Sequence, residues 1–191
     1  MKQHRLFFSV NLPEEFKEKL TEVQGEFREL PFKRAEPSQF HVTAYFLGSL
    51  TDQQMLEVLE VGEAVIRGKA PFVLRFDEVI YGPDVRRPRM IWARAKESGD
   101  FLNLQRDLRS AFRGLPFRVM AGRAEGAPHI TLARYNAAAA EDFEVFENNA
   151  LPPIQANLDY ALGVSTIDLM ESKLHRGGPE HFVLQSIPLE G

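Results

Sequence analysis

Two short segments of the chain carry the same pair of reactive side chains, a histidine followed two residues later by a threonine. The pairs are His41 with Thr43 and His129 with Thr131. An imidazole has an ordinary pKa of about 6.5, so near neutral pH one ring can accept a proton while another donates one. A threonine hydroxyl can donate a hydrogen bond to a phosphate oxygen. The two segments therefore predict acid–base chemistry at a phosphorus centre.

These pairs can act together only if the fold brings them face to face. Side chains alternate along a strand, so each histidine shares a face with its threonine, and strict alternation adds Tyr45 and Ala133 to those faces. Two such strands across a cleft would place a base and an acid on opposite sides of a phosphorus atom, as in-line displacement requires. The threonines would hold the non-bridging oxygens in the transition state. This chemistry requires no metal and no cofactor.

The residues alone leave alternatives open. A single His-x-Thr segment is commonly a core or surface histidine without a catalytic role, and two structural histidines stay an alternative to catalysis. An exchange of the acid and base roles between the two rings would look identical in the sequence. No metal site is expected, because the chain has no cysteine and no two histidines at helical i, i+4 spacing beside a glutamate.

Both segments occupy the same place in a repeated order of elements. Periodicity and turn residues predict strands over 5–10, 40–47, 72–81, 90–94, 128–134, 154–162, 164–174 and 182–187. Apolar stripes and capping residues predict helices over 16–30, 51–67 and 98–112, and a short helix over 136–146. We therefore predict one bilobal α+β domain over residues 1–191. Its two pseudo-symmetric halves each hold an antiparallel sheet with flanking helices, and the active-site cleft lies between the lobes.

Composition excludes several other classes of protein. The 191 residues are 44% hydrophobic and 26% charged, which is typical of a folded globular chain. The absence of cysteine excludes a disulfide scaffold and a cysteine nucleophile. No apolar run approaches the roughly 20 residues that span a bilayer, and the N-terminal apolar run breaks at Asn11 and Pro13, as in a first strand. We expect a cytoplasmic protein without membrane contact.

Charge is distributed unevenly along the chain. The net charge is −4, yet residues 84–134 hold eleven basic and five acidic side chains, a net +6, which leaves −10 for the remainder. A local basic region on an acidic protein suits a phosphate-bearing ligand, although a solvated surface without a partner is the alternative.

Two segments resemble a known family. Residues 40–48 (FHVTAYFLG) and 128–134 (PHITLAR) resemble the paired signatures of the two-histidine phosphoesterase superfamily. Within it, the chain is most similar to the RNA 2′,3′-cyclic phosphodiesterases, historically called 2′-5′ RNA ligases. Residues 5–13, 169–174 and 178–182 are also similar to this family, so the likeness runs along nearly the whole chain. One departure is His181, where the family more usually has tyrosine.

The resemblance implies a hydrolase that opens the 2′,3′-cyclic phosphate of an RNA end by water attack and leaves a 2′-phosphate. It implies that His41 is the general acid toward the departing 3′ oxygen and that His129 is the general base that activates water. It also implies that Thr43 and Thr131 bind phosphate oxygens.

Two further residues follow from their positions in the family pattern. The resemblance implies that Phe46 stacks on the terminal base and that Arg134 contacts the phosphate. Strict alternation places both side chains on the face away from the histidines, so a bulge or a strand end is needed to turn them. The basic loops around Lys33–Arg34 and Arg86–Arg89 are candidates for guiding the RNA backbone.

The expected partners are RNA ends or nucleotides with a 2′,3′-cyclic phosphate, bound by a monomer without cofactors. Reverse 2′-5′ ligation would share the transition state and need no ATP. The alternatives are a phosphodiesterase for a small cyclic or 2′-5′-linked nucleotide and a non-catalytic RNA-binding module. The remaining histidines, His4, His175 and His181, are expected to be solvated or structural.

Overall fold

Strands and helices follow one another in mixed order in the computed structural model, which describes residues 2–85, 87–120, 127–135, 152–175 and 178–191. The elements are β1 (His4–Asn11), α1 (Glu14–Val23), the 3-10 helix η1 (Gln24–Phe27), β2 (Phe32–Arg34), the 3-10 helix η2 (Pro37–Gln39), β3 (His41–Leu50), α2 (Asp52–Arg67), β4 (Phe72–Gly82), β5 (Met90–Ala95), α3 (Gly99–Phe112), β6 (His129–Tyr135), β7 (Tyr160–Val164), β8 (Thr166–His175) and β9 (Gly178–Pro188).

Several elements differ from the predictions. β2 lies in a stretch that the sequence favours as a loop, and the apolar stripe over 16–30 divides into α1 and η1. The strand expected from residue 154 begins only at Tyr160, while β9 begins four residues before the expected 182. The helix predicted over 136–146 lies outside the described residues.

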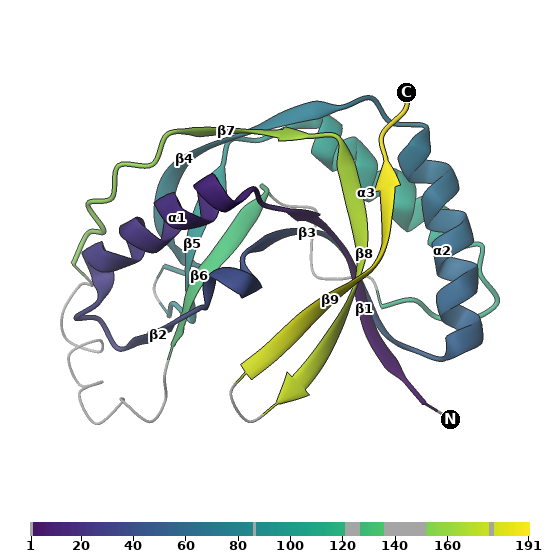
Figure 1. Cartoon of the computed structure of the whole chain (residues 1–191), viewed down its shortest axis with the longest axis horizontal. Helices are drawn as coiled ribbons and strands as arrows, with labels where there is room; N and C mark the ends of the chain where they lie inside the picture. Colours follow the sequence, from purple (N-terminus) through teal and green to yellow (C-terminus); the bar gives the residue numbers. More distant parts are fainter. Residues whose placement is uncertain (1, 86, 121–126, 136–151, 176–177) are drawn as a thin grey trace.

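The described strands form one curled antiparallel sheet (Figure 1). Their order is β7-β4-β5-β6-β3-β1-β8-β9, and β2 pairs with β6 off this path. Two four-stranded units, β7-β4-β5-β6 and β3-β1-β8-β9, meet where β3 pairs with β6 at Val42 and Ile130. This arrangement confirms the predicted α+β fold with two antiparallel halves and flanking helices.

The two sheet units are not the two successive halves of the chain. β4 comes from the first half of the sequence but pairs with β5 and β7, whereas β8 and β9 come from the second half but extend the unit of β1 and β3. The chain therefore crosses between the units repeatedly, which ties them into one structure.

Two helices, α1 and α3, cross over in the same way (Figure 1). Although α1 follows β1, it packs on the other unit: the Phe16 ring lies 5.2 Å from that of Phe76 on β4 and 3.9 Å from that of Tyr160 on β7. α3 follows β5, yet its Phe112 ring lies 5.2 Å from that of Tyr45 on β3. Each unit is thus covered by a helix from the other part of the chain.

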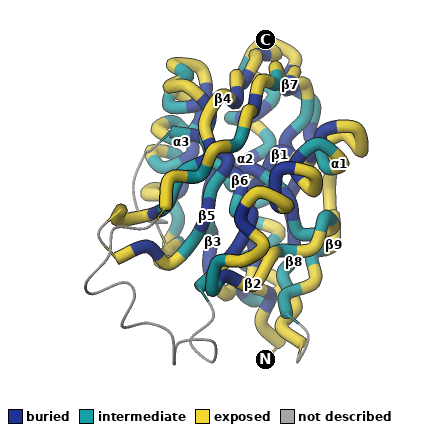
Figure 2. Tube along the Cα trace, turned by 90° about the vertical axis from the view of Figure 1, so that its left-hand side faces the viewer, coloured by how far each residue is buried: buried dark blue, intermediate teal, exposed yellow. Residues whose placement is uncertain are grey.

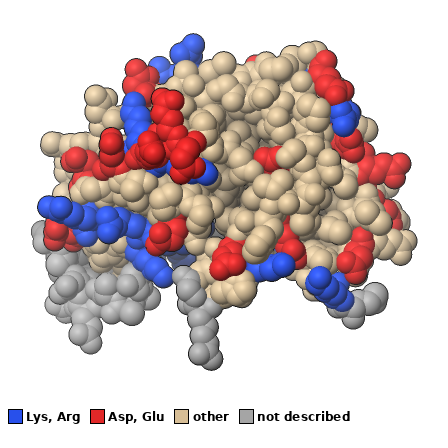
Figure 3. All heavy atoms as spheres, in the orientation of Figure 1, with Lys and Arg blue, Asp and Glu red and all other residues tan. Residues whose placement is uncertain are grey.

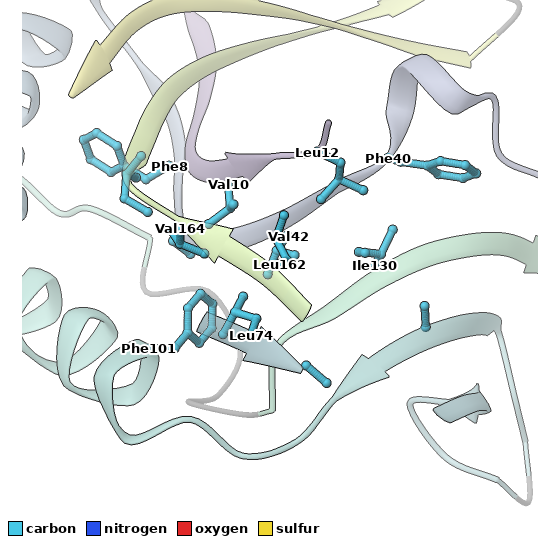
Figure 4. Close-up of a cluster of buried hydrophobic side chains, with 14 of the residues drawn as sticks. Phe8, Val10, Leu12, Phe40, Val42, Leu74, Phe101, Ile130, Leu162 and Val164 are labelled. Atoms are coloured by element: carbon cyan, nitrogen blue, oxygen red, sulfur yellow. The ribbon is translucent and has the colours of Figure 1, made fainter. Parts of the chain in front are cut away.

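The core lies between the sheet and these helices. Figure 4 shows apolar side chains from β1, β3, β4, β6, β7 and α3 pointing toward one another. α2 packs closely on β1 at Gly62, where an added Cβ would lie 2.6 Å from the Phe8 ring. Buried positions run along the inner strands, whereas β9 and the outer turns carry many exposed positions (Figure 2). No helix in the described part of the chain is both long and apolar enough to cross a membrane.

Candidate active site

One pocket brings the two His-x-Thr segments together. β3 contributes His41 and Thr43, and β6 contributes His129 and Thr131. The other lining residues are Ala35, Gln39, Arg134, Pro179 and His181. The buried residues that follow the histidines, Val42 and Ile130, pair with each other on the core side, which leaves both imidazoles on the pocket side. Side chains 88 positions apart in the sequence therefore share one pocket.

Both strands carry a β-bulge at the same place in the motif. The pairing of β1 with β3 skips Ala44, and the pairing of β5 with β6 skips Leu132, each the residue after the motif threonine. An extra residue in a strand reverses the alternation of the side chains beyond it. The prediction that Tyr45 and Ala133 share the face of the histidines is therefore wrong, because both are buried on the core side.

The bulges turn Phe46 and Arg134 toward the face that carries the histidines. Arg134 lines the pocket. Phe46 does not contribute to its lining among the described residues, but its half-buried ring carries the Arg5 guanidinium 5.1 Å from the ring centroid. The bulge that the sequence requires for these two positions is present in both strands.

Two glutamines from crossed helices support the bulges. At each bulge one backbone carbonyl, that of Ala44 or Leu132, accepts a hydrogen bond from a side chain. Gln105 Nε2 on α3 donates to the Ala44 carbonyl at 3.1 Å, and Gln24 Nε2, directly after α1, donates to the Leu132 carbonyl at 2.8 Å. The sequence reasoning missed both glutamines, since nothing local marks a contact between residues 61 and 108 positions apart.

The hydrogen bonds of the two histidines match. His41 Nδ1 lies 2.8 Å from the Gln39 carbonyl, and His129 Nδ1 lies 3.2 Å from the Ala127 carbonyl. A carbonyl only accepts, so Nδ1 carries the hydrogen in both rings, and Nε2 is left to gain or lose a proton. His41 Nε2 lies 3.1 Å from the Thr43 hydroxyl. Neighbouring backbone thus selects the same tautomer on both sides of the pocket.

The pocket favours neutral imidazoles in this structure. Burial lowers the pKa of His41 to about 4, and the neighbouring His181 and Arg134 act in the same direction. Burial also lowers the pKa of His129. An anion between the rings would favour their charged forms and raise both pKa values. The protonation state of both rings therefore depends on whether an anion is present.

An aromatic ring supports each of these histidines. The His41 ring packs on Phe7 from β1 with ring centroids 4.9 Å apart, and the His129 ring stacks on Trp92 from β5 at 4.1 Å. Trp92 in turn lies over Gly82, where an added Cβ would be 2.4 Å from the indole. These contacts restrict the rotation of both imidazoles.

The three remaining histidines differ in their surroundings. His4 is buried between Glu171, 2.6 Å from Nδ1, and Asp52, 2.9 Å from Nε2, which is a structural role. His175 is exposed. His181 lines the pocket, a position that the sequence did not indicate.

Gln39 joins the two sides of the pocket. Its backbone carbonyl holds His41, while its side-chain Nε2 donates to the Pro179 carbonyl of β9 at 2.9 Å. No local pattern in the sequence marks Gln39, because its partner lies 140 positions away.

Basic side chains lie on β2, directly before the pocket residue Ala35. Lys33 and Arg34 are exposed on β2, and Lys33 pairs in register with Arg134 on β6. Figure 3 shows basic side chains beneath α1 in the region of β2, and acidic side chains over α1. No three His, Asp or Glu side chains of the described residues are grouped so that they could hold a metal ion.

The chain is similar in sequence to curated enzymes. The chain is 34% identical to the RNA 2′,3′-cyclic phosphodiesterase of Thermus thermophilus over 98% of its own length and 91% of that protein. It is 26% identical to the enzyme of the same name from Aquifex aeolicus, over 83% of this chain and 82% of that one.

Solved structures show the same fold. A crystal structure of a Thermus thermophilus protein superposes with a TM-score of 0.81 at 30% identity and covers 98% of both chains. E. coli LigT in complex with 3′-AMP superposes with a TM-score of 0.74 over the whole of both chains at 22% identity, which shows a shared fold and no more. The family model of the 2′-5′ RNA ligase superfamily matches residues 12–173. The chain therefore belongs to the 2′-5′ RNA ligase superfamily.

Proposed function

We propose that this protein is a hydrolase, an RNA 2′,3′-cyclic phosphodiesterase that converts a terminal 2′,3′-cyclic phosphate to a 2′-phosphate. The observation that carries the proposal is the pocket in which two imidazoles, each with Nδ1 bonded to a backbone carbonyl, face one space. The relatives that bear this enzyme name cover most of the chain.

In the proposed reaction, water attacks phosphorus while Nε2 of His129 accepts its proton. The bond from phosphorus to the 3′ oxygen breaks, and Nε2 of protonated His41 donates a proton to that oxygen. The products are a 2′-phosphate and a 3′-hydroxyl. The hydroxyls of Thr43 and Thr131 and the guanidinium of Arg134 hold the non-bridging oxygens.

The electrostatics of the pocket support an acid that becomes charged only when substrate binds. With a pKa of about 4, His41 is neutral at pH 7 and cannot donate from Nε2. The negative phosphodiester raises this pKa toward its ordinary value of about 6.5 or above. In this proposal, binding of the substrate therefore drives protonation of the acid, His41.

The remaining parts of the proposal concern range and state. A 5′-hydroxyl in place of water would form a 2′-5′ bond by the same steps, without ATP. Phe46 supports the terminal base, and the basic side chains near β2 bind the RNA backbone. In this proposal the enzyme needs no metal and acts as a cytoplasmic monomer. Residues 1–191 act as one bilobal domain, because the pocket takes residues from both sheet units.

The first test is product analysis on a short RNA with a 2′,3′-cyclic end in excess EDTA. We expect a 2′-phosphate product, and rates about 10²–10⁴-fold lower for His41→Asn and His129→Asn. His175→Asn, which lies outside the pocket, is the control. Loss of activity in EDTA would contradict metal independence. Absence of turnover on any cyclic phosphate would favour the alternative of a non-catalytic RNA-binding module. Turnover of mononucleotides alone would favour the small-nucleotide reading.

A second test assigns the acid and the base. A cyclic substrate with sulfur in place of the 3′ oxygen has a leaving group that needs no proton. We expect this substrate to restore most of the rate of His41→Asn and little of that of His129→Asn. The opposite pattern would exchange the two roles.

A further inference from the structure

His181 is a third imidazole in the pocket and comes from β9, the last strand of the sheet. Its ring meets the His41 ring edge-on, with centroids 5.0 Å apart, and meets the Phe7 ring in the same way at 5.2 Å. Its cross-strand neighbour on β8 is Ser172. Three strands, β1, β3 and β9, therefore fix the place of this side chain against the proposed acid.

The ring nitrogens of His181 make no hydrogen bond to the described residues. Nδ1 is buried and has no hydrogen-bond partner among the described residues. Buried polar atoms are seldom unpaired, and an unpaired N–H is rarer than an unpaired acceptor. In the neutral ring we therefore place the hydrogen on Nε2, which makes this atom a donor without an assigned acceptor.

The two charged groups that act on the pKa of His181 are both positive. Arg134 from β6 and Arg5 from β1 act on it, and burial together with these two groups lowers its pKa. His41 is the titratable group that faces it from β3. The described residues that line the pocket include three histidines and an arginine but no carboxylate. An anion is the missing partner of this set of donors.

We propose that His181 binds the phosphate of the substrate and takes up a proton when an anion enters the pocket. This inference rests on the proposed function for the identity of the anion, since it extends the phosphate site from two imidazoles to three. The bound anion offers the acceptor that His181 lacks and compensates the positive charges of Arg5 and Arg134. Affinity for the anion would therefore rise as the pH falls toward 6.

Calorimetric titration with sulfate tests the proposal without requiring turnover. Sulfate keeps a constant charge near neutral pH, so any proton taken up on binding enters the protein, and titrations in two buffers of different ionisation enthalpy count it. We expect His181→Phe, which keeps an aromatic ring but no donor, to bind sulfate about 10-fold more weakly at pH 6. Its proton uptake should be smaller than that of the wild-type protein.

His181→Tyr separates donation from protonation. Its hydroxyl donates without titrating near pH 6, so we expect most of the sulfate affinity to return while the proton uptake stays reduced. His175→Phe changes a histidine on the same hairpin outside the pocket and should behave as wild type. Thermal unfolding of each variant shows that it is folded.

Three outcomes would overturn the proposal. They are wild-type sulfate affinity in His181→Phe, wild-type proton uptake in both His181 variants, and an equal loss of affinity in His175→Phe. If the wild-type protein shows His181-dependent sulfate binding but hydrolyses no cyclic phosphate, the proposed function fails and the anion site stands. If it hydrolyses cyclic ends while sulfate binding ignores His181, the reverse holds.

Discussion

The indole of Trp92 stacks on the imidazole of His129, with ring centroids 4.1 Å apart and an angle of 28° between the planes. Trp92 is the single tryptophan of the chain, so its fluorescence reports on the surroundings of one ring. A protonated imidazole quenches a stacked indole more strongly than a neutral one. The chain thus carries an internal probe of the proposed base.

This contact predicts a fluorescence titration. Because burial lowers the pKa of His129, we expect the emission of Trp92 to decrease as pH falls through a midpoint below 6.5. Added sulfate should raise the midpoint. In His129→Gln the transition should disappear, and its persistence there would show that another group causes the quenching.

The close contact between Gly82 and Trp92 predicts that a larger residue at position 82 lowers activity. A methyl group at this position would lie 2.4 Å from the indole, so Gly82→Ala must displace the ring that supports His129. We expect kcat/KM to fall by up to about 100-fold, together with a changed emission spectrum. Gly163→Ala in β7 is the matched control, because an added Cβ there meets nothing within 4 Å. Equal activities of the two variants would show that Trp92 does not position His129.

The lowered pKa of His41 predicts that the stability of the fold depends on pH. Its pKa is about 4 in the folded protein and about 6.5 in the unfolded chain, so between these values the unfolded chain binds a proton that the folded protein does not. The free energy of unfolding should therefore decrease as pH falls from 6.5 to 4, by at most about 3 kcal/mol from this group.

Denaturant unfolding at pH 7 and pH 4.5 measures this contribution. We expect His41→Gln to lose less stability over that interval than the wild-type protein, while His175→Gln keeps the wild-type difference. An equal loss of stability in all three proteins would show that a group other than His41 causes the pH dependence.

The hydrogen bond from Gln24 to the Leu132 bulge predicts that Gln24 affects substrate binding through Arg134. The residue is 3% exposed, and its side-chain Nε2 donates to the carbonyls of Ala35 at 2.9 Å and Leu132 at 2.8 Å. Gln24→Met removes both bonds while roughly keeping the volume, which should destabilise the fold by about 1–3 kcal/mol. Because the Leu132 bulge turns Arg134 into the pocket, we also expect KM to rise about 10-fold.

A double-mutant cycle separates positioning from simple destabilisation. If Gln24 acts through Arg134, Gln24→Met should raise KM little further in an Arg134→Ala background. Gln185→Met on the exposed face of β9 should leave KM unchanged. Independent, multiplying effects of Gln24→Met and Arg134→Ala on KM would contradict the coupling.

Local pattern was enough to predict most elements and the shared face of each His-Thr pair. Alternation marks His41 and Thr43 as neighbours on one face whatever the rest of the fold does. The same rule failed two residues later, because the bulge at Ala44 depends on a pairing with β1 that no local pattern contains. The sequence nevertheless showed that some such irregularity was needed for Phe46 and Arg134.

Long-range pairing explains the other differences. The pattern of Ile154, Ala156 and Leu158 resembles a strand, but these residues alternate because they pack on the core, and the ladder begins only at Tyr160. The place of His181 also depends on long-range pairing, because β8 pairs with β9 and sets His181 opposite Ser172. The crossing of α1 and α3 between sheet units has no signature along the chain.

The exchange of helices has a consequence for any attempt to divide the protein. A fragment ending near residue 84 would keep α1 but lose β5, β6 and β7, on whose unit that helix rests, and would leave β1 and β3 without α3. Such a fragment would expose apolar surface to water. We expect it to fold only when it is refolded together with the complementary fragment.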